Sequence, residues 1–212
     1  ASGVVHKGNG VQVIYGPRVT VIKSNLEDYL ESAPDEEYVP NTGNTAEAAA
    51  KEEEKPSGKV VKTEVIYSPV NGTAADISEA PDEAFAGRMM GDGAMVVPQE
   101  QTVYAPADGE VTALFPTLHA IGMKTVEDVE ILIHIGLDTV QLNGEGFEAM
   151  VQCGDKVKKG QLLIAFDKEL IEGKGYCLET PVIITNSDDF LDVVETAEGE
   201  VEPGNSLVKI LK

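Results

Sequence analysis

Residues 129–147 read V-E-I-L-I-H-I-G-L-D-T-V-Q-L-N-G-E-G-F, and this stretch decides the fold. Apolar side chains occupy every second position at its start: Val129, Ile131, Ile133 and Ile135. Alternation of this kind predicts a strand with one buried face. His134 lies between them and is expected on the opposite face, because side chains alternate across a strand. Gly136 then permits a turn or a close approach of another segment. The pattern predicts a reactive imidazole at the end of a rigid strand.

The composition of the 212-residue chain limits its possible functions. Its formal net charge of -21 argues against a nucleic-acid partner, since binding to phosphates requires basic surfaces. No apolar run approaches the roughly 20 residues of a membrane-spanning helix, so no direct membrane insertion is expected. The two cysteines, Cys153 and Cys177, are too few for a disulfide framework and are expected to be reduced thiols of a cytosolic protein.

From residue 61 to 212, short apolar segments alternate with glycine, proline and aspartate, which predicts an all-β sandwich or barrel. The segment also repeats itself. Residues 66–72, I-Y-S-P-V-N-G, recur as V-Y-A-P-A-D-G at 103–109, and residues 157–164 recur in part at 201–208. We therefore expect an antiparallel β-sandwich or barrel built from a duplicated motif. A few short helices are expected near residues 80–85, 168–172 and 187–196.

Residues 1–32 look like the end of a domain whose beginning is missing. About thirty residues cannot bury enough surface to fold alone. Strands are expected over 11–15 and 19–22, followed by a short helix over 24–30 that begins with a capping box.

The next segment has a different composition. Residues 31–58 carry eight acidic side chains and two lysines, together with three prolines that interrupt a helix. Such a segment has little apolar surface to offset the entropy of ordering it. We expect an acidic, flexible linker over residues 33–60.

His119 and His134 are the candidate reactive residues. If 111–115 and 120–124 are neighbouring strands that lead into 129–135, the two imidazoles can meet at one sheet edge. The spacing alone also fits two unrelated histidines. Sequence reasoning therefore leaves a paired site as one of two interpretations.

A pair of imidazoles suits phosphoryl transfer. A neutral imidazole has a nucleophilic ring nitrogen, and a second ring can donate N–H to the phosphoryl oxygens. Thr117 could hydrogen-bond the His119 ring and fix its tautomer. The chain has no Walker loop and no G-x-G-x-x-G motif, so any phosphoryl group would come from another protein. A relay is therefore favoured over a kinase.

Two other chemistries are compatible with parts of the pattern. Zinc hydrolysis could use two histidines and a carboxylate such as Asp138, although no H-E-x-x-H or comparable compact motif is present. A carrier domain with a prosthetic group on Lys124 is the weaker possibility, because the following residue is not the one such hairpins use.

Residues 62–212 resemble the glucose-type IIA component of the phosphoenolpyruvate-dependent sugar phosphotransferase system. The matching segments follow the family's order: Y-S-P-V-N-G-T, P-D-E-A-F-A, G-D-G, Y-A-P-A-D-G-E-V, F-P-T-L-H-A, I-L-I-H-I-G-L-D-T-V-Q-L-N-G-E-G-F and T-P-V-I-I-T-N. The apolar-x-H-apolar-G-apolar-D-T-V core is the most specific of them. The resemblance implies an antiparallel β-sandwich with a duplicated motif, in agreement with the repeats.

The resemblance also implies a role for each site residue. His134 would be the phosphoacceptor, taking the group on Nε2 from the histidine-containing phosphocarrier protein HPr and passing it to a IIB cysteine. His119 would be the second active-site histidine, and Thr117 its hydrogen-bonding partner. No cofactor and no metal is implied.

A docking face for protein partners is implied around the histidines. Its expected residues are Asp82, Ala84, Phe85, Phe115, Gly136 and Asp138. The acidic rim would meet basic residues of partners, and an apolar patch suits a transient interface. Core packing is the alternative for the two phenylalanines.

Residues 1–32 resemble the C-terminal end of a glucose-type IIB domain, which is a partial α/β unit here. The chain would then be the cytoplasmic tail of a membrane-bound permease, in the order membrane domain, IIB, linker, IIA. A zinc peptidase of the lysostaphin type and a phosphorylation-dependent regulatory module, with regulatory proteins as partners, are the alternative functions. The transported sugar is not indicated by this part of a permease.

Overall fold

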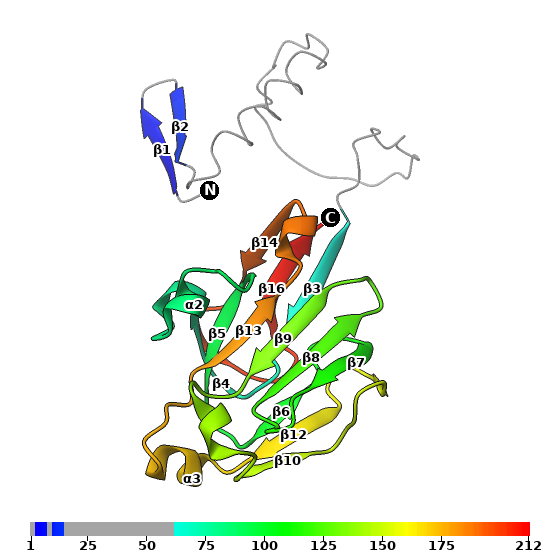
Figure 1. Cartoon of the computed structure of the whole chain (residues 1–212). Coiled ribbons are helices and arrows are strands. Elements are labelled where there is room, and N and C mark those ends of the chain that lie inside the picture. The colour runs from blue at the N-terminus through cyan, green and yellow to red at the C-terminus, as the bar shows by residue number, and fades with distance from the viewer. Residues whose placement is uncertain (1–2, 8–9, 15–61) are drawn as a thin grey trace, which may run out of the picture. The chain divides into compact units, whose positions relative to one another are not determined.

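The computed structural model describes residues 3–7, 10–14 and 62–212 (Figure 1). The chain divides into two units, Ala1–Lys55 and Pro56–Lys212. Across the described residues, no helix is both long and apolar enough to cross a membrane.

In the first unit, strand β1 (Gly3–Lys7) pairs antiparallel with β2 (Gly10–Ile14). β2 agrees with the expected strand over 11–15, whereas β1 was not expected. The strand expected over 19–22, the helix over 24–30 and the linker over 33–60 lie outside the described residues.

The second unit is built almost entirely of antiparallel strands. They are β3 (Thr63–Tyr67), β4 (Gly72–Asp76), β5 (Asp92–Pro98), β6 (Thr102–Tyr104), β7 (Gly109–Leu114), β8 (Ala120–Thr125), β9 (Glu130–His134), β10 (Phe147–Ala149), β11 (Lys156–Val157), β12 (Leu162–Phe166), β13 (Thr180–Ile184), β14 (Asp192–Glu195), β15 (Gly199–Val201) and β16 (Ser206–Leu211). An eight-stranded sheet has the order β11-β7-β8-β9-β13-β5-β4-β15, and three-stranded sheets have the orders β10-β12-β6 and β14-β16-β3. The prediction of an antiparallel β-sandwich is confirmed.

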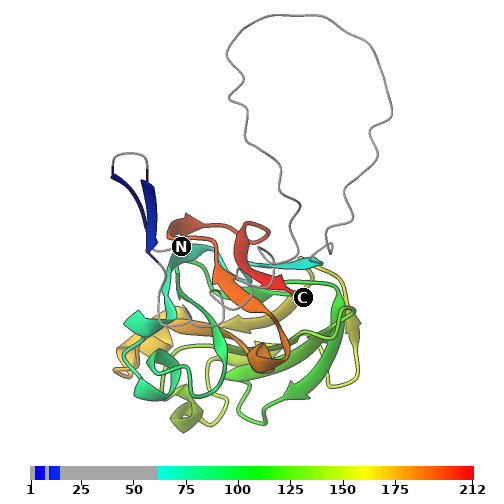
Figure 2. The ribbon, with the colours of Figure 1, turned by 90° about the horizontal axis from the view of Figure 1, so that it is seen from above.

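The first and last strands of this unit lie side by side. β3, in cyan, pairs with β16, in red, and Figure 2 shows the two next to each other. The pairing closes the β unit on itself, so its first and last strands share one small sheet.

The repeated segments occupy equivalent places in the large sheet. Gly72 of β4 pairs with Val201 of the edge strand β15, and Gly109 of β7 pairs with Val157 of the opposite edge strand β11. A Cβ atom would lie 2.1 Å from a carbonyl oxygen of the neighbouring strand at Gly72 and 2.3 Å from one at Gly109. Both turns therefore need glycine, and the order of equivalent strands is the same from either edge of the sheet.

The two copies of the Tyr-x-Pro motif also hydrogen-bond to each other. The Tyr67 N–H donates to the Pro106 carbonyl at 3.1 Å, and the Tyr104 N–H donates to the Pro69 carbonyl at 2.7 Å. This reciprocal exchange is what two copies related by an approximate twofold axis would make. The duplication predicted from sequence is therefore present in the backbone.

The main core lies between the large sheet and the small sheets. Alternate residues of β9 and its flanks point into it, as the opening pattern predicts: Val129, Ile131, Ile133 and Ile135 are at most 2% exposed. Each such side chain stabilises the fold by roughly 1.5–3 kcal/mol through burial. This burial orients β9, so that its outward side chains are Glu130, Leu132 and His134.

Within residues 62–212, helices are few and short. They are α2 (Glu83–Ala86), α3 (Lys168–Gly173) and the 3-10 turns η1 (Ile77–Glu79), η2 (Thr139–Leu142) and η3 (Ser187–Asp189). The helix predicted over 187–196 is wrong beyond its first turn, because β14 forms there and pairs with β16. Val193 is buried and Val194 is exposed, so this segment has the period of a strand.

A second, smaller apolar cluster covers the outer face of the large sheet. The segment that contains η1 and α2 contributes three side chains to this cluster: Ile77, Ala80 and Phe85. They pack against Met95, Leu137 and Ile183. In Figure 1, α2 lies beside β5. The segment therefore brings Phe85 across the outer face toward the end of β9.

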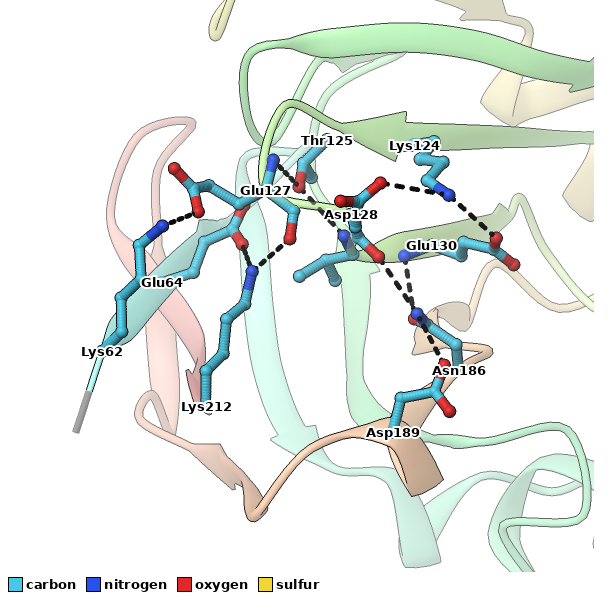
Figure 3. A network of polar contacts seen from close by, with 11 residues as sticks. Lys62, Glu64, Lys124, Thr125, Glu127, Asp128, Glu130, Asn186, Asp189 and Lys212 are labelled. Atoms are coloured by element: carbon cyan, nitrogen blue, oxygen red, sulfur yellow. Dashed lines mark hydrogen bonds and ion pairs between the residues drawn. The ribbon is translucent and has the colours of Figure 1, made fainter. Parts of the chain in front are cut away.

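A polar network lies at the other end of β9, where the chain enters the unit (Figure 3). Lys62 pairs with the Glu127 carboxylate, and Lys212 donates to the Glu127 carbonyl and pairs with Glu64 at 2.7 Å. Asn186 donates to the Asp128 carbonyl at 3.0 Å. These contacts tie the first and last described residues of the unit to the turn between β8 and β9.

Candidate functional site

The two histidines lie at neighbouring positions on adjacent strands. β7, β8 and β9 form an antiparallel meander in which Ala120 faces His134. The Ile135 N–H donates to the His119 carbonyl at 2.7 Å, so the residue before β8 is also held against β9. The two ring centroids are 4.8 Å apart and the rings are inclined at 80°. The structure thus brings together the two imidazoles that spacing alone left undecided.

The His134 ring is held by a backbone carbonyl. Its Nδ1 lies 2.6 Å from the Gly136 oxygen. A carbonyl can only accept, so Nδ1 carries a proton and the neutral ring has its lone pair on Nε2. Gly136 has φ +68°, and a Cβ there would lie 2.6 Å from the Cys177 oxygen and 2.7 Å from the Thr139 side chain. Glycine is therefore required for the turn that presents this carbonyl.

Burial lowers the pKa of His134 below its ordinary value. The Gly136 carbonyl and the carboxylates of Asp82 and Asp138 act in the opposite direction, because they favour the charged ring. His134 is half-buried, so it is not fully enclosed by the protein. The site thus keeps a neutral imidazole that is prepared to accommodate positive charge.

His119 is the more enclosed of the two rings, at 6% exposure. Its Nδ1 lies 2.6 Å from the Thr117 hydroxyl oxygen. Burial, and then the charge of His134, lowers the pKa of His119 to about 4. Its ring is therefore neutral at pH 7. The turn that places Thr117 beside it includes Leu118 at φ +55°, whose N–H donates to the Phe115 carbonyl.

Two phenylalanines flank the pair. The Phe85 ring centroid is 5.3 Å from that of His134, and the Phe115 centroid is 5.6 Å from that of His119. Phe85 is 5% exposed and belongs to the outer apolar cluster, whereas Phe115 is 40% exposed. The structure thus separates them: Phe85 packs and touches the site, and Phe115 presents an apolar surface beside it.

The remaining predicted residues surround His134. Asp82 caps α2 by accepting from the Ala84 N–H at 2.7 Å, and both side chains are half-buried. Asp138 is exposed and has φ +58° at the start of η2. Both carboxylates influence the pKa of His134, so they lie close enough to act on its charge.

Comparison with known proteins places this geometry in a family. The model of the family described as phosphoenolpyruvate-dependent sugar phosphotransferase system, EIIA 1, matches residues 64–190. The chain belongs to this family. The IIA match covers all the residues of the histidine site.

Two curated relatives match across nearly the whole chain. The glucoside-specific EIICBA component of Staphylococcus carnosus is 40% identical over 216 residues, covering 99% of this chain. The glucose-specific EIICBA component of Staphylococcus saprophyticus is 39% identical and covers 100% of this chain. The chain spans 30% of the length of each of these relatives.

A solved structure has the same fold. Glucose permease IIA from Mycoplasma capricolum is 35% identical, with a TM-score of 0.64, and the match covers 70% of this chain and 96% of that one. The glucose-type IIA resemblance found from the motifs is thereby confirmed, together with the β-sandwich it implies.

The sequence analysis did not identify Thr139 and Cys177, which contact the turn next to His134. The Thr139 hydroxyl donates to the Ile135 carbonyl at 2.6 Å, and the Leu137 N–H donates to the Cys177 carbonyl at 3.3 Å. Both contacts shape the turn that contains Gly136. Thr139 could have been found from the D-T-V motif, but nothing in the sequence places Cys177 here. Cys153 and Cys177 are both free thiols.

No metal centre is indicated in the part of the chain that the structure describes. Its residues include no group of three or more His, Cys, Asp and Glu side chains placed to hold a metal ion. The two rings stand nearly edge to face, and each Nδ1 has a protein partner. The zinc-peptidase interpretation gains no support from this arrangement.

Proposed function

We propose that residues 61–212 are a IIA phosphocarrier whose phosphoacceptor is His134. The observation that carries the proposal is the contact between His134 Nδ1 and the Gly136 carbonyl, which leaves the Nε2 lone pair free. The family supplies the reaction class, and the absence of a nucleotide-binding motif implies a protein donor. Phosphorylated HPr is that donor.

The first transfer balances without any other reactant. The N–P bond of the donor phosphohistidine breaks as the His134 Nε2 lone pair forms a new N–P bond, and the donor ring leaves neutral. The His134 Nδ1 proton stays in place, so the phosphorylated ring becomes positively charged. The Gly136 carbonyl and the carboxylates of Asp82 and Asp138 stabilise that charge.

His119 orients the phosphoryl group. When the Thr117 hydroxyl donates to Nδ1, the ring proton of neutral His119 is on Nε2. This N–H then donates to a phosphoryl oxygen on His134, whose ring is 4.8 Å away between centroids. The fixed donor favours the loose transition state of the outgoing transfer.

The recipient is a cysteine of a IIB domain. We infer that residues 1–32 are the C-terminal remnant of such a domain and that residues 33–60 are the linker to IIA. Alignment of nearly the whole chain with EIICBA proteins supports this order. The chain would then be the cytoplasmic tail of a permease, and the tether raises the effective concentration of IIA near its recipient.

The test is to phosphorylate the chain with phosphorylated HPr and to locate the modified residue by mass spectrometry. We expect one phosphoryl group, on His134. His134→Gln should remove all label, and it keeps a side chain of similar polarity so that the fold can be verified by circular dichroism. Label on another residue, or label retained in His134→Gln, would contradict the mechanism.

No finding favours a second function. The phosphorylation-dependent regulatory module would use the same site and is not distinguished by the geometry. The two relatives are named for a glucoside and for glucose, and they align equally well. The two matches therefore do not distinguish between these two sugars.

A further inference from the structure

A single arginine joins both ends of the segment that covers the outer face. Arg88 Nε lies 2.8 Å from an Asp92 oxygen at the start of β5. Its Nη2 lies 3.5 Å from Asp76 at the end of β4 and 3.6 Å from Glu195 on β14. Since residues 77–91 run between Asp76 and Asp92, the guanidinium bridges the two points where this segment leaves and rejoins the sheet.

Glu195 fastens the same segment to a different sheet. Its Oε1 accepts from the Ile77 N–H at 3.3 Å, at the first residue of η1. Its side chain is 19% exposed. The start of the segment is therefore attached to β14 both directly and through Arg88.

The backbone at Arg88 has an unusual conformation. Arg88 has φ +54°, which glycine adopts freely and other residues rarely adopt. Glycine would therefore fit this backbone position without its conformational cost. The Arg88 N–H also donates to the Phe85 carbonyl at 2.9 Å, so this residue is connected directly to the ring that touches His134.

We propose that Arg88 is a positioning residue for the phosphoacceptor: it locks residues 77–91 on the sheet and so holds Phe85 against His134. The inference rests on the proposed function of His134. Phe85 takes water away from one side of the imidazole, and burial is the main cause of the lowered pKa of His134. Loss of the lock would let the segment move, expose the ring and weaken its placement for transfer.

The decisive variant is Arg88→Gly, because it removes the side chain while relieving the backbone. Its matched control is Asp128→Gly, another exposed position with φ +66°, in the turn at the opposite end of β9. Arg88→Lys retains the positive charge, so it should keep part of the wild-type positioning of Phe85 and show a smaller change than Arg88→Gly. Two quantities are measured: the pKa of His134 by NMR titration of its ring, and the rate of phosphoryl transfer from phosphorylated HPr.

We expect Arg88→Gly to raise the pKa of His134 toward 6.5 and to slow transfer by roughly 10-fold, since small displacements of a reacting group are costly. Asp128→Gly should change neither quantity. An unchanged His134 titration in a folded Arg88→Gly protein would overturn the proposal. If the wild-type chain accepts no phosphate, the proposed function fails, while the titration still decides whether Arg88 positions Phe85.

Discussion

The two halves of the large sheet have the same strand order but different residues at equivalent ends. In one half, Ala120 of β8 faces His134 of β9. In the other half, Gly93 of β5 faces Ile183 of β13. His134 and Ile183 are therefore equivalent, and both point to the outer face of the sheet. One is the candidate phosphoacceptor and the other packs in the outer apolar cluster.

The residues that precede these pairs differ in the same way. His119 stands before β8 and is held by Thr117, whereas Asp92 begins β5 and is held by Arg88. The connections differ as well. Residues 77–91 form a long segment between β4 and β5, whereas residues 115–119 form a short turn between β7 and β8.

This asymmetry gives the equivalent ends of the two halves different surroundings. The long connection, residues 77–91, packs over Ile183, and its Phe85 ring contacts His134. The connection of one half therefore forms part of the surroundings of His134 in the other half. The short turn leaves Phe115 40% exposed beside the His119 ring, and His134 is half-buried. Residues 77–91 thus cover one half of the duplicated backbone, and the short turn of residues 115–119 leaves the other half open.

The largest effect is expected when a residue of the covered half replaces its equivalent in the open half. His119→Asp places at this position the carboxylate that Asp92 has, without the arginine that neutralises it. A buried carboxylate beside a phosphoryl group is repelled by it, and the donor N–H is lost. We expect the rate of acceptance from phosphorylated HPr to fall by at least roughly 10³-fold, measured by quenched-flow labelling.

The matched variant is His119→Gln, which keeps a neutral hydrogen-bonding side chain. It should still accept phosphate on His134 but transfer it to a IIB cysteine roughly 10²-fold more slowly, because one fixed donor is weakened. Equal loss of acceptance in both variants would show that the negative charge is not the cause.

Much of this could be predicted because it depends on local pattern. The alternation from Val129 to Ile135 predicts β9 and the outward direction of His134, since a strand has a strict period of two. The two Pro-x-[Asn/Asp]-Gly segments predict the duplication, because each turn admits only glycine at its end. The resemblance to the IIA family then named the second histidine.

The contacts that hold the site together could not be predicted from local pattern, because they depend on long-range packing. The family resemblance placed Phe85 on a face around the histidines, but no pattern within residues 77–91 shows that its ring packs against His134. Arg88 reads as an ordinary surface charge, since its partners Asp76 and Glu195 are far apart in sequence. The helix expected over 187–196 failed for a related reason: pairing with β16 overrides a weak local preference.

A second test concerns the turn that only the open half contains. Gly136→Ala would bring a Cβ within 2.6 Å of the Cys177 carbonyl in a left-handed backbone conformation. We expect the free energy of unfolding to fall by about 3 kcal/mol, with loss of the carbonyl contact to His134. Urea denaturation measures this change.

Its control is Gly154→Ala, which also has positive φ, at +91°, but has no heavy atom within 4 Å of the added Cβ. That variant should lose only about 1 kcal/mol, the cost of the backbone conformation alone. Similar losses at the two glycines would mean that the contact with Cys177 relaxes easily and does not set the turn.

The last test concerns the dependence of stability on pH, to which one group in the open half and one group beside the covered half contribute with opposite signs. Burial lowers the pKa of His119 to about 4, from 6.5. Between pH 4 and pH 6.5 the His119 ring is protonated in the unfolded chain and neutral in the folded protein. The free energy of unfolding therefore falls as the pH decreases from 6.5 toward 4. On β14, in the small sheet beside residues 77–91, burial and then Asp76 raise the pKa of Glu195 to about 7, although the Ile77 N–H and Arg88 oppose this. Between 4.5 and 7 the folded protein retains that proton, so this contribution to stability is lost as the pH rises.

The two groups therefore oppose each other between pH 4.5 and 6.5, and each can be removed alone. His119→Gln should lose the slope that favours high pH, and Glu195→Gln the slope that favours low pH, each of about 1.4 kcal/mol per pH unit at most. The change in the urea midpoint between pH 6.5 and pH 5 should then differ from that of the wild type in opposite directions for the two variants. If both variants changed the midpoint in the same direction, the protonation state assigned to His119 or to Glu195 would be wrong. Opposite slopes would show that the folded unit holds a neutral imidazole at His119 and retains a proton on the Glu195 carboxyl in the same pH range.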